Sequence, residues 1–203
     1  MREILPGLYH WTAFHQGIGM DVSSYYDASS RALFDPMLPP DGGVDAFSGM
    51  PEPELILLTN RHHYRQSGAF VDRFGCPVRC HESGLHEFKR GEQVEGFAFG
   101  DEVAPGVVAL DMAAICPDDS VLALREQGAL AFADGIVNFG DGGLGFVPDQ
   151  LMDGPEDVKR GVRAKSKRLL QEQKFDALLF AHGQPVIAGG REALREFVES
   201  AQA

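Results

Sequence analysis

The feature of the sequence that most constrains the fold is the stretch from Leu55 to Phe70, LILLTNRHHYRQSGAF. It begins with an apolar run, Leu55–Leu58, which is typical of a short strand buried on both faces. A polar turn with two histidines follows at residues 60–65, and Gln66–Arg73 has the pattern of a helix start. Because α/β proteins place their sites where buried strands give way to helices, this turn is the first candidate for a functional site.

The length and composition indicate an ordinary globular protein. With 203 residues, 44% apolar and 24% charged, we predict a single domain over residues 1–203 with one well-buried core. The sequence has no apolar run of about eighteen residues and no apolar signal-peptide core near its start, so we expect a cytoplasmic protein without membrane contact. A net charge of −12 argues against nucleic acid as a partner, because a polyanion would be repelled.

The remaining chain alternates strand patterns with glycine-rich and helical segments. Strands are predicted at residues 4–15, 22–26, 31–34, 77–81, 103–109, 121–125, 128–133 and 175–181, a helical turn at 85–89, and helices from Pro155 and over 190–201. Residues 39–53 are rich in Pro and Gly and predict a loop with at most a short helix at 44–48. The glycine-rich residues 135–154 are interpreted as a flexible lid or a subunit contact.

The histidine turn resembles the signature of the metallo-β-lactamase-fold hydrolases, in which a buried strand ends in T-H-x-H-x-D-H and a helix follows. Aligned on Thr59, Asn60 stands at the first His of that motif and His62 at the second. Tyr64 stands at the Asp and Arg65 at the last His. The scaffold is therefore similar, while one of the four ligand positions is kept.

Other segments resemble the same family. Residues 130–134, LAFAD, are similar to its L-x-x-G-D strand, and residues 178–185, LLFAHGQP, to its final L-x-P-G-H-G-x-P segment. Residues 114–118 fall near its G-H-T-P-G-S motif, with Ile115 at the His. Since the resemblance covers nearly the whole chain, it implies a fold of class α/β (α+β), a four-layer αββα sandwich.

The resemblance also implies a reduced set of metal ligands. Family members hold one metal with three His and a second with Asp, His and His; here His62 remains for the first, and Asp134 and His182 for the second. A catalytic zinc ion needs three protein ligands. Arg65 cannot ligate a cation and is expected to pair with Asp134 as an internal counter-charge. Tyr64, with a reference pKa of about 10, does not replace a carboxylate.

Three hypotheses about function follow. The first is a divergent member without di-zinc activity and without a cofactor, which binds a small ligand, anionic if Arg61 and Arg65 attract it. Its cleft would be formed by Asn60, Arg61, His62, Tyr64, Arg65, His81, Asp134 and His182. The second is a metal-dependent hydrolase that holds one zinc, iron or manganese ion with His62, Asp134 and His182. The third is a non-catalytic homodimer that uses residues 139–146 and the segment before Pro53 as its contact.

Several polar residues are assigned lesser roles. His63 is expected at the surface or in support of the site, because consecutive side chains of extended backbone point apart. Asp35 is interpreted as a turn residue that satisfies its own backbone, with bracing of a site as the alternative. The three cysteines are too few and scattered for a disulfide framework, and Cys116, beside acids, is a poor nucleophile. No G-x-S-x-G motif is present.

Overall fold

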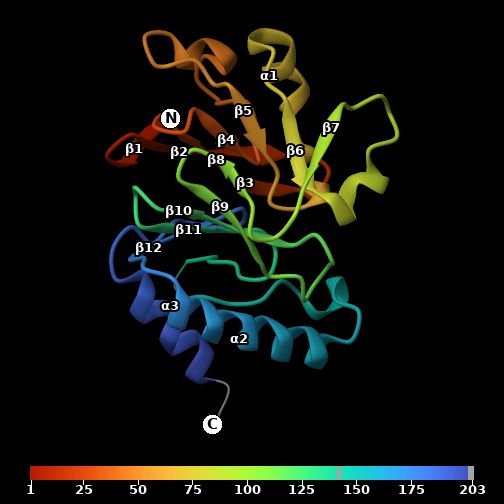
Figure 1. Ribbon diagram of the computed structural model, residues 1–203, viewed down its shortest axis with the longest axis vertical. Coiled ribbons are helices and arrows are strands. Elements are labelled where there is room, and N and C mark those ends of the chain that lie inside the picture. Colours follow the sequence, from red (N-terminus) through yellow and green to blue (C-terminus); the bar gives the residue numbers. More distant parts are fainter. Residues whose placement is uncertain (141–142, 201–203) are drawn as a thin grey trace.

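The computed structural model describes residues 1–140 and 143–200 and consists of two β-sheets packed face to face, with helices on their outer faces (Figure 1). The first sheet has the order β1-β2-β3-β4-β5-β6-β7. Its strands are β1 (Arg2–Leu5), β2 (Leu8–His15), β3 (Met20–Asp27), β4 (Ala32–Phe34), β5 (Leu55–Leu57), β6 (Val78–His81) and β7 (Val94–Phe97). The second sheet has the order β12-β11-β10-β9-β8. Its strands are β8 (Glu102–Ala104), β9 (Val107–Asp111), β10 (Ser120–Leu124), β11 (Ala129–Phe132) and β12 (Ala177–Phe180).

The first sheet is antiparallel from β1 to β4 and parallel from β4 to β7. Strand β5 is buried on both faces, as its apolar run predicts. Leu55 and Leu57 face the second sheet, whereas Ile56 lies in the outer apolar cluster. That outer face is covered by α1 (Ser67–Phe74) and by a short 3-10 helix, η1 (Gly43–Phe47), whose Phe47 ring contacts Phe70 edge to face.

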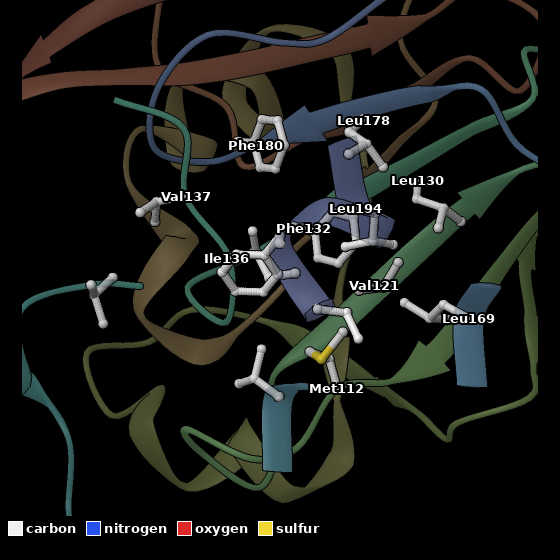
Figure 2. Close-up of a cluster of buried hydrophobic side chains, with 14 of the residues drawn as sticks. Met112, Val121, Leu130, Phe132, Ile136, Val137, Leu169, Leu178, Phe180 and Leu194 are labelled. Atoms are coloured by element: carbon white, nitrogen blue, oxygen red, sulfur yellow. The ribbon is translucent and has the colours of Figure 1, made fainter. Parts of the chain in front are cut away.

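The second sheet is antiparallel except for β12, which runs parallel to β11. Two helices, α2 (Pro155–Glu172) and α3 (Gly190–Glu199), cover its outer face. Helix α2 begins with Pro155, followed by two acidic residues that complement the helix dipole. Figure 2 shows Leu169 of α2 and Leu194 of α3 beside Val121 and Leu130 of the sheet.

Three apolar clusters fill the spaces of the molecule. One lies between the first sheet and α1, one between the second sheet and its helices, and one between the two sheets. The middle cluster takes side chains from both sheets, including Tyr25, Phe34, Leu122 and Leu179. Three filled interfaces require four layers, so the predicted αββα sandwich is confirmed.

Some elements differ from the prediction because Pro-Gly pairs divide them. The strand predicted at residues 4–15 is a hairpin of β1 and β2, with a turn at Pro6-Gly7 where Gly7 has a φ of 72°. The strand predicted at 103–109 is likewise divided into β8 and β9 at Pro105-Gly106. The helical turn predicted at 85–89 overlaps η3 (Glu82–Glu87) only at residues 85–87, and β7 was not predicted.

The glycine-rich stretch packs in part against the second half of the chain. Val137 forms a backbone bridge with Gly145, and the Phe146 ring lies 5.0 Å from that of Phe197. Residues 141–142 lie outside the described part, and the interpretation of this stretch as a lid or subunit contact stays a prediction. Within the described part of the chain, no helix combines the length and the apolar character needed to span a membrane.

Candidate metal centre

The ends of four strands meet at one edge of the sandwich and carry the polar side chains of the candidate centre. Asp35 directly follows β4, and the histidine turn follows β5. On the second sheet, Asp134 follows β11 and His182 follows β12. Because β4 and β5 are parallel, as are β11 and β12, each pair presents its carboxyl ends together.

The histidine turn is a 3-10 helix, η2 (Arg61–Tyr64), and not extended backbone. Asn60 caps it: its side-chain oxygen accepts a hydrogen bond from the His62 backbone N–H at 2.9 Å. The tight turn leaves His62 exposed and directs His63 inward, where only 4% of its surface remains exposed. The sequence analysis placed His62 in the site and His63 at the surface or in support of it; the structure places His63 inside and His62 at the surface.

Three side chains converge at this edge. Nε2 of His182 lies 3.1 Å from Oδ1 of Asp134, and Nε2 of His63 lies 3.4 Å from the same oxygen. One donor atom from each of the three residues lies within 4.8 Å of the others. The converging group is His63, Asp134 and His182, so His63 takes the place that the sequence analysis gave to His62.

The far side of His63 is held by a second carboxylate. Nδ1 of His63 lies 3.0 Å from Oδ2 of Asp35 and 2.9 Å from Oγ1 of Thr59. Thr59 in turn donates to Asp35 from its backbone N–H at 2.8 Å and from its hydroxyl at 2.5 Å. Asp35, interpreted from sequence as a turn residue, therefore braces the centre, in line with the alternative left open for it.

The charges of this network favour a protonated His63 between two carboxylates. Burial by itself would lower the pKa of His63, but the charges of Asp35 and Asp134 outweigh it and raise this pKa to about 9. Burial would raise the pKa of Asp134, whereas the charge of His63 and the hydrogen bond from His182 hold it well below its usual range. The pKa of Asp35 is lowered in the same way, against burial, mainly by His63.

Arg65 does not form the expected ion pair with Asp134. Its guanidinium donates to three backbone carbonyls, those of Ser23 at 2.7 Å, Asp35 at 2.8 Å and Ala181 at 3.3 Å. These carbonyls belong to both sheets, so Arg65 ties the sheets together beside the centre. The positively charged partner of Asp134 is His63 instead.

The other residues predicted for the cleft are distributed around the turn. Asn60 belongs to the centre, because its amide donates to Oδ2 of Asp134 at 2.7 Å. Arg61 forms an ion pair with the buried carboxylate of Asp118. Outside the converging group, the Tyr64 ring lies 6.0 Å from that of Phe88, and the His81 ring stacks 3.9 Å from that of Phe99.

A buried acid that the sequence did not single out lies behind the centre. Asp119 is fully buried, and neither carboxyl oxygen has a hydrogen-bond partner among the described residues. Burial, followed by the charge of Asp134, raises the pKa of Asp119 well above its ordinary value. The acid sits against Gly135, where a Cβ would lie 3.0 Å from its Oδ2. No sequence signal distinguishes it from the neighbouring Asp118.

The converging donor set fits a single divalent metal ion. Two ligands that each lie about 2.1 Å from a tetrahedral ion are about 3.4 Å apart. The separations of 3.1 Å and 3.4 Å between the imidazole nitrogens and Oδ1 of Asp134 match this spacing. Within residues 1–140 and 143–200, His63, Asp134 and His182 form the single group of three such ligands.

Comparison with known proteins settles the fold. No protein-family model and no curated protein matches the sequence. Among solved structures, a metallo-β-lactamase family protein from Thermus thermophilus superposes with a TM-score of 0.68 at 20% identity, over 98% of this chain and 81% of its own. A metallo-β-lactamase from Pontibacter korlensis gives a TM-score of 0.69 at 17% identity, over 98% and 97%. The chain has the metallo-β-lactamase fold.

A third solved structure that superposes on this chain contains iron. The protein TTHA1623, solved in a di-iron-bound form, superposes with a TM-score of 0.61 at 21% identity, over 91% of each chain. The metallo-β-lactamase fold of the present chain places its own converging group at the carboxyl ends of β11 and β12 and next to the turn after β5.

Proposed function

We propose that the protein is a metal-dependent hydrolase with a mononuclear centre, in which Nε2 of His63, Oδ1 of Asp134 and Nε2 of His182 hold one ion. The observation that carries the proposal is that these three donor atoms lie within 4.8 Å of one another, with both imidazole nitrogens at the ligand spacing of a tetrahedral site from Oδ1 of Asp134. With three protein ligands, one position stays open for water or substrate.

In two of the three ligands, His63 and Asp134, the atom that does not face the ion is already engaged, which supports the assignment. Asp35 occupies Nδ1 of His63, and the Asn60 amide occupies Oδ2 of Asp134. Each of these two ligands is thus fixed in orientation by a partner on its far side, the arrangement that protein metal sites use to orient ligands. Asp134 remains partly open to solvent, with 21% of its side chain exposed, which provides a path for entry.

The chemistry of such a centre is hydrolytic. A bound zinc-type ion supplies an activated water whose pKa lies near 7. The chain itself contributes orientation and charge: Asp35 holds the tautomer of His63 that presents Nε2, and Asp134 offers a carboxylate charge. Arg61 and Arg65 are both engaged with protein groups. The geometry therefore adds no support to their role as attractants of an anionic ligand, which stays a prediction.

A second candidate is a metal-free binding protein, and the electrostatics of His63 favour it. A protonated His63 between Asp35 and Asp134 places a positive charge where a cation would otherwise bind. In this case the cleft around the histidine turn would bind a small molecule without hydrolysing it. The two candidates differ in whether His63 takes up a metal ion in place of its proton.

Metal binding separates these candidates. Protein purified without chelator would be assayed for metal content and then titrated calorimetrically with Zn²⁺, Mn²⁺ and, under anaerobic conditions, Fe²⁺. We expect one equivalent bound by the wild type, loss of binding in His63→Ala and His182→Ala, and retention in His62→Ala, the matched control one residue away. Absence of binding at any excess would support the metal-free candidate. Binding of two equivalents would contradict both.

The dimeric interaction protein remains a third hypothesis, without a geometric observation in its favour. Light scattering over the working concentration range tests it directly, since a monomer at every concentration would remove its basis.

A further inference from the structure

A small cavity opens beside the candidate centre. Its volume is about 140 Å³, and it is lined by Thr12, Asp21, Ser23, Asn138, Phe139, Gly183 and Gln184. These residues come from the hairpin of β2 and β3 and from the segments that follow β11 and β12. Gly183 directly follows His182, so the cavity adjoins the metal ligands from the side of the second sheet.

The polar groups of the cavity fall into two sets. The first set is engaged: Ser23 donates to the Gly183 carbonyl at 2.8 Å, and the Asn138 amide donates to the Gln184 carbonyl at 2.8 Å. The second set consists of the side chains of Thr12, Asp21 and Gln184. None of these three has a hydrogen bond or ion pair with any residue of the described chain.

The charge of the side chains without partners determines which kind of ligand the cavity can bind. Asp21 carries the one formal charge among the seven lining residues, and no Lys or Arg is among them. Phe139, with 57% of its surface exposed, adds an aromatic ring to the wall. A cavity that presents both a carboxylate and an aromatic ring attracts an organic cation and repels an anion. Thr12 and Gln184 add oxygen acceptors for the N–H groups of a primary ammonium.

We propose that this cavity binds the ammonium end of a small ligand. The volume of about 140 Å³ is below the roughly 300–1,000 Å³ of sites that enclose a drug-sized molecule, so the cavity takes one end of the ligand. The rest of the molecule would extend past Gly183 toward His182. That this molecule is the substrate of the metal centre rests on the function proposed above.

The test uses three probes of equal length, propylammonium, propionate and propan-1-ol, added to chelator-treated protein and followed through backbone amide NMR signals. We expect propylammonium to produce saturable shifts at Thr12, Asp21, Phe139 and Gly183. Propionate is expected to produce no shifts there, and propan-1-ol is expected to bind at least fivefold more weakly than propylammonium. Equal or stronger binding of propionate would overturn the proposal.

Variants assign the binding to the cavity. Asp21→Asn is expected to raise the Kd of propylammonium at least fivefold, and Phe139→Leu at least twofold. Glu126→Gln is the matched control, because Glu126 is an exposed acid in the turn before β11, at the far end of the sheet from Asp134. An unchanged Kd in Asp21→Asn would refute the assignment. Because the probe needs no metal, binding of propylammonium without any metal binding would leave this inference standing while the proposed hydrolase falls.

Discussion

His10 illustrates at the scale of one residue how the surroundings of a buried side chain set its charge. Nε2 of His10 lies 2.9 Å from Oγ of Ser23, and its ring stacks on Tyr25 at 4.9 Å. Burial, with smaller contributions from Arg2 and the N-terminal amine, lowers the pKa of His10 to about 4 from an ordinary value of 6.5. The folded protein therefore keeps this ring neutral at pH values where the unfolded chain protonates it.

This difference predicts a specific pH dependence of stability. Between pH 6.5 and 4 the unfolded state binds more protons at His10, so the free energy of unfolding falls as the pH falls. A shift of this size corresponds to about 3 kcal/mol in total. In His10→Gln, which keeps an amide donor for Ser23, we expect a correspondingly smaller loss over this range. Urea unfolding at several pH values checks it, and parallel curves for the two proteins would contradict it.

The residues of the centre show what the sequence could and could not reveal. Asp134 and His182 were predicted because the segments that carry them resemble two motifs of the metallo-β-lactamase-fold hydrolases, and each lies two residues after a buried strand that fixes its position. His63 was missed because the direction of a side chain in a turn depends on backbone geometry that the residue types do not specify. Asn60, by capping η2, closes the predicted turn into a 3-10 helix, which directs His63 inward and leaves His62 exposed.

At the scale of elements, the segment after β12 has the tightest backbone fit in the centre. Gly183 has a φ of 102°, and a Cβ at this position would lie 1.7 Å from the carbonyl oxygen of Asn138. The two segments are held together by hydrogen bonds from Asn138 N–H to the His182 carbonyl at 3.1 Å and from Gln184 N–H to the Asn138 carbonyl at 2.9 Å. A side chain at Gly183 would force these segments apart.

We therefore expect Gly183→Ala to lower the free energy of unfolding by at least about 3 kcal/mol, because the clash is with backbone and cannot be relieved by a side-chain rotation. Gly189→Ala is the matched control: it also has a positive φ, of 71°, but no atom within 4 Å of the added Cβ. Its cost should be about 1–2 kcal/mol, the penalty of the left-handed backbone alone. Urea denaturation of both variants measures the difference, and equal costs would contradict the steric argument.

Elements were predicted better than their boundaries. The strands of the second sheet and both long helices follow from apolar patterns that burial alone explains. The Pro-Gly turns at residues 6–7 and 105–106 were overlooked as dividers of two strands, although their residue types signal turns. Strand β7 has one buried residue, Phe97, so its sequence carries too little apolar pattern to be found.

At the scale of the whole molecule, the cluster between the sheets makes the two halves depend on each other. Leu57 from β5 is fully buried in this cluster together with Leu122 and Leu179 of the other sheet. We expect Leu57→Ala to lower the free energy of unfolding by about 2–5 kcal/mol. We also expect both halves to unfold in one transition, because neither sheet can keep its inner face out of water alone.

Two probes check this cooperativity. Trp11, the single tryptophan, reports on the first sheet by fluorescence, and far-UV circular dichroism is dominated by α2 and α3 on the second sheet. The two urea transitions should coincide in the wild type and in Leu57→Ala. Leu151→Ala, at a side chain that is 68% exposed, should leave the midpoint unchanged. Separate transitions for the two probes would show that the halves are independent.

The three converging residues and the bracing Asp35 come from two distant parts of the chain: Asp35 and His63 precede residue 65, whereas Asp134 and His182 follow residue 130. During translation, Asp35 and His63 are therefore synthesised before Asp134 and His182, the residues that lie opposite them in the folded protein. His182 is the last of the four to be synthesised. Because His182 follows the last strand of both sheets, the three proposed ligands can hold an ion together only after the residues of both sheets have been synthesised.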